Sequence, residues 1–523
     1  MHKTIRKANR LVNLAFCACA ALVLSACSNP LRQESTPEPA LAPTRTPVSQ
    51  QEQIARAQAT PTTTPRPASE TSTTPEAEPK QPTPMATAAM RYAACSTVQP
   101  DVGRVEPNLA SDGGQIVYVT TDNNIMLTDP TGRKITPITS DAFVSENRQA
   151  GRVYQFPTFS NDGRFIAFVS LSASEGFNGI TNTVHVAPVS GGTITDLYST
   201  SEWNIPYVDW SPDSNQVAFL TISPRSGAIR VVGRSGGDIS IFDTGSPTYW
   251  HWRADSAAMI THLGGRATTK GLANVSVIEA KGAVKGEQTI IEELPGAFQS
   301  PHWSPDGRHM LFVAYTDGQD ELVLADASGK PVCTLESVED NAYFAWSPNG
   351  KYVAVLDTSP SPQGILVPAA LTIYDLGAGT SNVVHDEASM FFWSPDGKKL
   401  AVYSIVFDAT LTPLGDGAGK RGAPLAQTRS PALRIEIVDV ATGTKIKVAD
   451  TYPSRQFIQY FPYFDQYSRA ITPWSPDGRR LVLASISPTR ETADIAVATL
   501  NAAGTSVDLN RIAAGTIAFW SPR

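Results

Sequence analysis

The most regular feature of the chain beyond about residue 100 is a series of apolar, strand-like runs separated by short polar turns. One theme recurs: an aromatic or apolar residue, then Ser-Pro-Asp-Gly or a variant, then an apolar run such as FIAFVS. The serine of this theme, or its equivalent, stands at Ser111, Ser160, Ser211, Arg253, Ser304, Ser347, Ser394 and Ser475, with a truncated copy at Ser521. Repeats of about 40–50 residues with several short strands each are typical of β-propeller blades.

Each unit is predicted to hold four strands. In the fifth unit a short inner strand ends at Trp303, and the three further strands are predicted at His309–Tyr315, Asp320–Asp326 and Val332–Ser337. The Pro of the connecting turn presets φ, the Asp can bond local backbone, and the Gly accepts positive φ. The tryptophans that precede Ser-Pro are expected to pack between blades, and they are Trp210, Trp303, Trp346, Trp393, Trp474 and Trp520.

These W-S-P-D-G-(K/R) units resemble the WD-like repeats of TolB-type β-propellers. Similar repeats occur in the propeller domains of dipeptidyl-peptidase-IV-like and prolyl-oligopeptidase-like enzymes. The resemblance covers about residues 100–523 and implies an all-β propeller fold, but it assigns no activity, because propellers serve many functions. Such enzymes carry an added hydrolase domain, which we do not expect here because the chain ends inside a repeat. TolB is expected to have six blades and a separate N-terminal domain, unlike this chain.

Eight full motifs predict eight four-stranded blades, and seven blades, with the weak unit at Arg253 absorbed, is the alternative. The longest gap between motifs follows Ser394 and is interpreted as an insertion, Asp408–Ala432, rather than as a ninth blade. The terminal TIAFWSP matches an inner strand with no blade after it. We expect this strand to close the ring by pairing with the first blade, which removes an exposed sheet edge.

The N-terminal residues predict export and a lipid anchor. A basic start and an apolar run from Leu11 to Leu24 have the form of a signal peptide, and Leu-Ser-Ala-Cys at its end has the form of a bacterial lipobox. We therefore predict a lipoprotein signal peptide at 1–26, acylation of Cys27, and a Pro/Thr-rich disordered linker at 27–95 before the propeller at 96–523. The expected location is the extracytoplasmic side of the cell membrane, or the outer membrane facing the periplasm where there are two membranes. An ordinary signal peptide is the alternative.

Charge and cysteine content narrow the possible partners. The net charge is −7 and becomes more negative once the basic start is removed, so nucleic acid is not an expected partner. After export only Cys95 and Cys333 remain as thiols of the folded part. They are expected either to form one disulfide or to lie apart as buried cysteines, since sequence alone cannot place them.

Known catalytic and metal motifs are missing from the sequence. It contains no G-x-S-x-G, H-E-x-x-H or C-x-x-C. We therefore expect no enzymatic activity, no cofactor and no metal. One candidate channel site remains, because Asp209, His251 and His302 occupy the same position, just before the aromatic residue, in three successive units. It is interpreted as a polar ligand site, a metal site or ordinary packing.

The densest aromatic segment runs from Tyr452 to Tyr467. Aromatic side chains with polar groups are typical of recognition surfaces. The residues of this candidate binding surface are Tyr460, Phe461, Tyr463, Phe464, Arg455 and Asp465. The alternative is an elongated inner strand that packs between blades.

We predict from these features a non-enzymatic, lipid-anchored propeller that binds a protein or peptide partner at the cell envelope. The alternatives are a module that binds a small ligand, glycan or metal in its channel and, ranked last, a hydrolase. The long connections are expected to gather on one face, and they are Ser172–Asn182, Asp357–Ala369, Asp408–Ala432 and Tyr452–Tyr467. That face is the predicted binding face.

Overall fold

The computed structural model describes Cys95 and residues 114–523, apart from 147–149, 175–178, 225, 267–272, 283–284, 340, 359–367, 407–431 and 487–491. The predicted signal peptide, Cys27 and all of the linker before Cys95 lie outside the described residues. Within the described part of the chain, no helix is long and apolar enough to cross a membrane.

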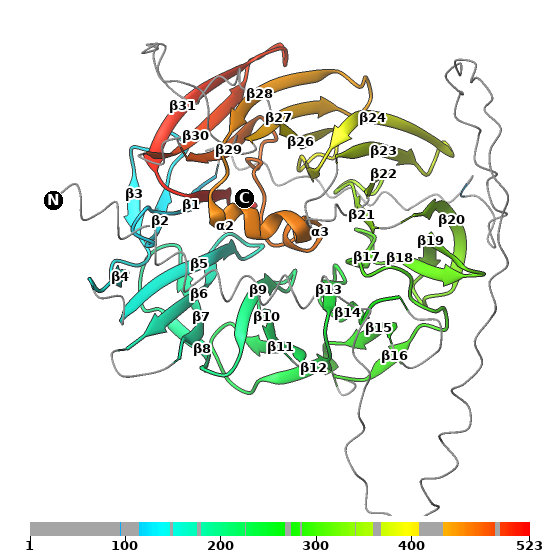
Figure 1. Cartoon of the computed structure of the whole chain (residues 1–523), viewed down its shortest axis with the longest axis horizontal. Helices are drawn as coiled ribbons and strands as arrows, with labels where there is room; N and C mark the ends of the chain where they lie inside the picture. The colour runs from blue at the N-terminus through cyan, green and yellow to red at the C-terminus, as the bar shows by residue number, and fades with distance from the viewer. Residues whose placement is uncertain are drawn as a thin grey trace, which may run out of the picture. The chain divides into compact units, whose positions relative to one another are not determined.

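Eight antiparallel sheets stand around a common centre and form the blades of an all-β propeller (Figure 1). The strands of blades 1 and 2 are β1 (Ile116–Val119), β2 (Ile125–Thr128), β3 (Ile135–Pro137), then β4 (Phe143–Val144), β5 (Gly151–Phe159), β6 (Phe165–Ala173), β7 (Thr181–Pro188) and β8 (Thr195–Thr200). Those of blades 3 and 4 are β9 (Asn204–Trp210), β10 (Gln216–Ile222), β11 (Gly227–Gly233), β12 (Ser240–Thr244), then β13 (Thr248–Trp252), β14 (Ala258–Leu263), β15 (Asn274–Glu279) and β16 (Gln288–Ile290). The prediction of eight blades is confirmed. The seven-blade alternative is wrong, because the unit at Arg253 has its own sheet.

The second half of the ring repeats the plan. Blades 5 and 6 contain β17 (His302–Trp303), β18 (His309–Thr316), β19 (Gln319–Asp326), β20 (Pro331–Val338), then β21 (Asn341–Trp346), β22 (Tyr352–Thr358), β23 (Ala369–Asp375) and β24 (Thr380–Ala388). Blades 7 and 8 contain β25 (Met390–Trp393), β26 (Lys399–Val406), β27 (Ala432–Asp439), β28 (Lys445–Thr451), then β29 (Arg480–Ile486), β30 (Ala493–Leu500) and β31 (Val507–Ala514). In blade 8 a single bridge, Trp474 to Leu481, stands in for the inner strand. β26 pairs directly with β27, so the long gap holds an insertion and no ninth blade.

The two ends of the propeller sequence close the ring. The last strand, β32 (Ile517–Trp520), pairs antiparallel with β1 from Ile116↔Trp520 to Val119↔Ile517 and supplies the inner strand of blade 1. The expected closure by the terminal strand is confirmed.

The tryptophans of the repeat lie between neighbouring blades, as expected. Trp210 donates its indole N–H to the Thr158 carbonyl (3.2 Å), and Trp474 donates to the Phe392 carbonyl (3.0 Å). Each bond reaches the inner strand of the preceding blade. Trp474 is fully buried, so its ring adds apolar contact area to this link between blades.

The propeller has two unlike faces because consecutive strands alternate in direction. The turns that join first to second strands and third to fourth strands are short and share one face, which we call the short-turn face. Neighbouring turns touch there, since the Asp162 amide donates to Ser214 Oγ (3.0 Å) and the Asp213 amide to Ser256 Oγ (2.9 Å). The remaining connections share the opposite, loop-rich face. All four long connections start and end at that face, although most of Asp357–Ala369 and Asp408–Ala432 lies outside the described residues.

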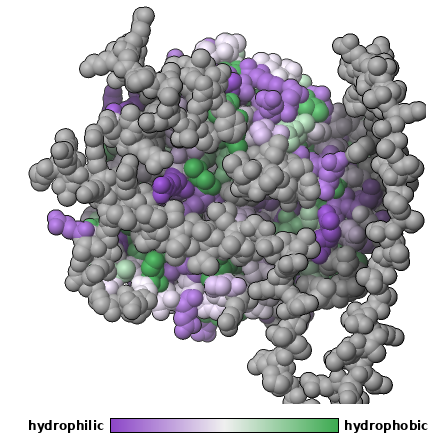
Figure 2. All heavy atoms as spheres, viewed as in Figure 1, coloured by the Kyte–Doolittle hydropathy of each residue, from purple (hydrophilic) through white to green (hydrophobic). Residues whose placement is uncertain are grey.

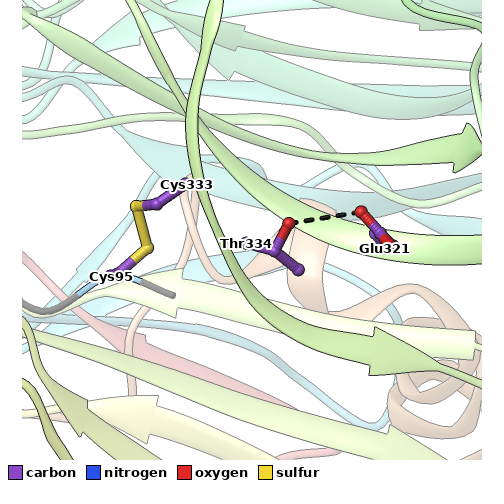
Figure 3. Close-up of a disulfide and its surroundings, with 4 residues drawn as sticks. All are labelled: Cys95, Glu321, Cys333 and Thr334. Carbon is purple, nitrogen blue, oxygen red and sulfur yellow. Dashed lines mark hydrogen bonds between the residues drawn. A yellow bond between two sulfur atoms is a disulfide. The ribbon is translucent and has the colours of Figure 1, made fainter. Parts of the chain in front are cut away.

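One disulfide joins Cys95 to Cys333 of β20, with 5.1 Å between their Cα atoms (Figure 3). Cys333 is the third residue of β20, so it lies near the short-turn end of that strand. Of the two arrangements left open by the sequence, the bonded one is found.

Replacing Cys333 by Ser is expected to lower the free energy of unfolding by about 2–4 kcal/mol, because a cross-link between distant residues restricts the unfolded chain. Urea denaturation with and without a thiol reductant measures this. The reductant should shift the wild-type curve and leave the variant's curve in place. A wild-type curve insensitive to reduction would contradict the expectation.

Candidate functional site

The lining of the central channel is polar on one side and apolar on the other. The residue before the repeat's aromatic position is Thr158, Asp209, His251 and His302 in blades 2 to 5, and Ala345, Phe392, Pro473 and Phe519 in blades 6, 7, 8 and 1. Asp209 and His302 are buried in the described structure. The imidazole rings of His251 and His302 lie 4.6 Å apart, so the predicted channel residues of neighbouring blades do come together.

A helical segment of the chain itself occupies the channel mouth. After β28 the chain forms α2 (Arg455–Tyr460), η2 (Phe461–Tyr463) and α3 (Phe464–Tyr467) before it enters blade 8, and in Figure 1 these helices lie at the centre of the ring. Ser454 caps α2 by accepting the Phe457 amide (3.0 Å). We call residues 453–473 the plug.

The end of the plug is bound to the polar side of the channel by specific hydrogen bonds. Gln466 pairs with the backbone of Trp250, donating to its carbonyl (3.0 Å) and accepting its amide (3.2 Å). Arg469 donates to the carbonyls of Trp250 (2.5 Å) and Pro301 (2.9 Å), and its Nε donates to His302 Nε2 (2.8 Å). The plug therefore satisfies inner-strand backbone groups that point into the channel.

Aromatic rings hold the rest of the plug. Tyr460 is 2% exposed and meets Phe156, Tyr467 and Phe519 edge-on, with centroids 4.4–5.7 Å apart. On the other side, Phe464 lies 5.0 Å from Tyr343. These aromatic side chains contact blades 1 and 2 on one side of the channel and blade 6 on the other. The plug therefore connects blades across the centre of the propeller.

The predicted binding surface is only partly a surface. Tyr460, Phe464 and Asp465 are buried, because the segment is helical and turns these side chains toward the channel wall. For these three residues the candidate binding surface is therefore wrong. The alternative is right that the segment packs against the blades, but it does so as helices and not as an inner strand. Of the other three, Arg455 is exposed, while Phe461 and Tyr463 are half-buried.

Burial shifts the titration of the channel groups in opposite directions. Desolvation raises the pKa of Asp209 to about 7 and that of Asp465 to about 6, although the nearby Arg469 charge works against both shifts. Desolvation, with the Arg469 charge, also holds the pKa values of His251 and His302 well below the usual value. Both imidazoles are therefore neutral, and each accepts a hydrogen bond: His251 Nδ1 from the Trp303 amide (2.8 Å) and His302 Nε2 from Arg469.

Single substitutions of these groups are expected to change the pH dependence of stability with opposite signs. Between about pH 4.5 and 6 the unfolded chain protonates His302 and the folded chain does not, so this residue makes stability rise with pH. Asp209 binds its proton only in the folded chain over this range, and it makes stability fall with pH. His302→Gln should lower the slope of unfolding free energy against pH by up to about 1.4 kcal/mol per unit, and Asp209→Asn should raise it as much.

Denaturant unfolding at several pH values measures these slopes. A variant that only weakens packing would lower the unfolding free energy equally at every pH and keep the wild-type slope against pH. Equal slopes in all three proteins would contradict the assignment.

Arg469 and Gln466 are the site residues that the sequence did not reveal. They lie outside the repeats, and their partners come from blades 3 to 5, more than 150 residues earlier in the chain. The sequence does contain a pattern that favours helices in the plug. Its aromatic residues recur at three- and four-residue intervals, at Phe457, Tyr460, Phe464 and Tyr467. No group of three or more His, Cys, Asp or Glu side chains in the described ranges is placed to hold a metal ion.

A second polar arrangement lies within blade 2. His185 accepts or donates at both ring nitrogens, with Asp196 Oδ1 2.7 Å from Nδ1 and Ser170 Oγ 2.7 Å from Nε2. Burial lowers the pKa of His185, and Asp196 opposes the shift. This is the order of groups in a Ser-His-Asp hydrolase. However, Ser170 is 3% exposed, and its strand pairs with neighbours on both sides, at Tyr154 and Thr183.

Similar proteins are found both by sequence and by structure. No family model matches the chain. An uncharacterized protein of Agrobacterium fabrum is 25% identical over 278 residues, which cover 48% of this chain and 85% of that protein. Dipeptidyl-peptidase 5 of Porphyromonas gingivalis is 28% identical over 97 residues, 17% of this chain and only 14% of that enzyme.

The solved structures similar to this chain carry different names. Oligogalacturonate lyase from Vibrio parahaemolyticus is 14% identical, with 75% of this chain and all of that chain covered and a TM-score of 0.42. TolB from Acinetobacter baumannii is 14% identical, with 63% and 77% covered and a TM-score of 0.34. At this level of similarity no activity passes to this chain. The chain is an eight-bladed β-propeller whose structural neighbours include TolB proteins.

Proposed function

We propose that the chain is an exported, lipid-anchored propeller that binds a protein partner at the cell envelope through its loop-rich face and catalyses no reaction. The observation that carries this proposal is the plug. Its Arg469 and Gln466 already engage the polar side of the channel, so a small ligand there would have to displace both. Recognition is then left to the outer surface.

The disulfide supports the exported location. Bonded cysteines persist in oxidising compartments and are rare in the cytosol of most organisms, and Cys95 lies at the start of the folded part. Cys27→Ala should abolish labelling by a fatty-acid analogue and release the protein from membranes. Equal labelling of wild type and variant would refute the anchor.

The loop-rich face offers exposed apolar side chains for a partner. Ile458 of α2 is 51% exposed and Phe143 of β4 is 53% exposed, and Arg455 is exposed on the same helix as Ile458. Among the coloured residues on the side shown in Figure 2, green areas are small and separated by purple and white. Single aromatic or aliphatic anchors within a polar surround are typical of protein interfaces.

Two sets of surface substitutions test the binding face against the partner captured from membranes. The first set is Arg455→Ala, Ile458→Ser and Phe143→Ser on the loop-rich face, and the second is Arg308→Ala, Lys351→Ala and Ile241→Ser on the short-turn side. We expect the first set to weaken binding at least about tenfold and the second to leave it unchanged. Loss of binding from the second set alone would overturn the proposal.

Hydrolysis is a second candidate because of the Ser170–His185–Asp196 arrangement. In this hypothesis Ser170 Oγ attacks the carbonyl carbon of an ester or amide while His185 takes its proton. The bond to the leaving alcohol or amine then breaks, His185 returns the proton to that group, and water later hydrolyses the acyl-serine. A fluorophosphonate probe tests it: labelling that is lost in Ser170→Ala and reduced in His185→Ala supports a hydrolase. No labelling of the wild type leaves the arrangement as a hydrogen-bonded ladder across the blade.

A further inference from the structure

The short-turn face carries an outer layer of cationic side chains. In five blades the residue directly after the turn glycine is an exposed Lys or Arg, and these are Arg164, Arg308, Lys351, Lys398 and Arg479. The turns between third and fourth strands add further exposed cations, which are Arg133, Lys134, Lys281, Lys285, Lys330 and Lys445. The repeat places them on one face, because each turn has the same position in its blade.

Some aspartates of the same turns are less exposed than these cations. Asp306 accepts the Arg308 amide (3.0 Å), and Asp396 accepts the Lys398 amide (3.1 Å), while both carboxylates are half-buried. Some cations pair with them, as Arg164 does with Asp162 (2.7 Å). Six acidic residues are also exposed on this face, and they are Asp196, Asp213, Asp238, Asp255, Glu287 and Asp508. The exposed cations named above are nearly twice as many, although some of them pair with these acids, as Lys281 does with Asp213 (2.7 Å).

The loop-rich face has the opposite character. Its exposed acidic residues include Asp122, Glu146, Glu202, Glu292, Asp317, Glu339 and Glu387. Asp386, next to Glu387, instead reaches Lys445 of the following blade (3.8 Å). Three of its exposed arginines pair with acids of the same face: Arg152 with Asp141 (2.6 Å), Arg266 with Asp320 (2.5 Å) and Arg511 with Asp494 (2.6 Å). Exposed cations are therefore more numerous on the short-turn face, and exposed acids predominate on the loop-rich face.

Exposed aliphatic side chains accompany the cations around the rim of the short-turn face. Ile135, Ile241, Val332 and Leu509 are 44–52% exposed, and each is among the first three residues of an outer strand, at its short-turn end. Ile135 directly follows Arg133 and Lys134, and Val332 is two residues after Lys330. Lys and Arg beside aliphatic side chains are the composition of surfaces that lie on lipid headgroups.

The disulfide holds Cys95 at the same face. Cys333 lies at the short-turn end of β20, three residues after Lys330, and it fixes Cys95 there. Cys95, the last residue of the predicted linker, therefore lies on this side of the propeller.

We propose that the short-turn face lies on an anionic membrane surface and that the acidic, loop-rich face points away from it. Each Lys or Arg near such a surface contributes about 1 kcal/mol of attraction, which is screened by salt. The proposal rests on the proposed function only for the anchor at Cys27, and the experiment leaves that anchor out.

Co-sedimentation with vesicles tests the docking. The full mature chain carrying Cys27→Ser, which cannot be acylated there, is mixed with vesicles of phosphatidylcholine alone or of phosphatidylcholine with phosphatidylglycerol, at low and high salt. We expect binding to the phosphatidylglycerol vesicles at low salt and loss of it at high salt. Lys330→Gln, Lys398→Gln and Arg479→Gln together should weaken it at least about tenfold.

A matched control makes the same change in net charge on the other face, with Arg455→Gln, Ser201→Asp and Gln319→Glu. It should bind as the parent does, and thermal melts check that both triple variants fold. The proposal is overturned if the parent ignores phosphatidylglycerol at low salt, or if the two triple variants lose binding equally. Absence of acylation at Cys27 in cells would refute the proposed anchor and leave this result unaffected.

Discussion

Arg469→Met is expected to lower the free energy of unfolding by about 3–5 kcal/mol. The change removes the donors that meet the Pro301 carbonyl and His302 Nε2, and it leaves the Trp250 carbonyl with only its bond from Gln466. It also removes the positive charge beside the buried carboxyls of Asp209 and Asp465. Urea denaturation at neutral pH measures the loss.

Arg455→Met is the matched control for this variant. It lies at the start of the same helical segment, but its side chain is exposed, so its effect should stay within about 0.5 kcal/mol. If both variants unfold at the same urea concentration as the wild type, Arg469 does not hold the plug in the channel.

Trp520→Ala should cost a similar amount, about 3–5 kcal/mol, because it empties a fully buried site in the strand that closes the ring. Weaker pairing of β32 would also expose the edge of β1 and favour aggregation on heating. Calorimetry and light scattering during the same thermal scan measure the two effects.

Leu509→Ala provides the comparison, since this residue is 44% exposed on an outer strand. The melting temperature of the Leu509→Ala protein should stay near that of the wild type. A Trp520→Ala protein that melts together with Leu509→Ala, without aggregating, would show that closure by β32 contributes little to stability.

The propeller could be predicted from the sequence because each blade repeats the same local signals. Ser394 Oγ donates to Asp396 Oδ1 (2.6 Å) in the turn, and Gly397 has a φ of +65°, as the Ser-Pro-Asp-Gly pattern requires. Such interactions span only a few residues, and they recur in blade after blade. The number of blades and the closing strand follow from counting them.

The plug could not be predicted because its stability comes from distant partners. Tyr and Phe favour strands locally, yet Tyr460 and Phe464 lie in helices, where rings from blades 1, 2, 6 and 7 surround them. The partner of the channel residues could not be predicted for the same reason. His251 and His302 lie side by side, but Arg469, which donates to His302 and whose charge acts on Asp209, belongs to no repeat.

A photo-reactive amino acid placed at Ile458 or at Val332, in the intact protein in its own membrane, tests the account most directly. We expect a discrete protein adduct from position 458, on the loop-rich face, and none from position 332, which should label lipid. A protein adduct from position 332 alone, or no adduct from position 458, would contradict it.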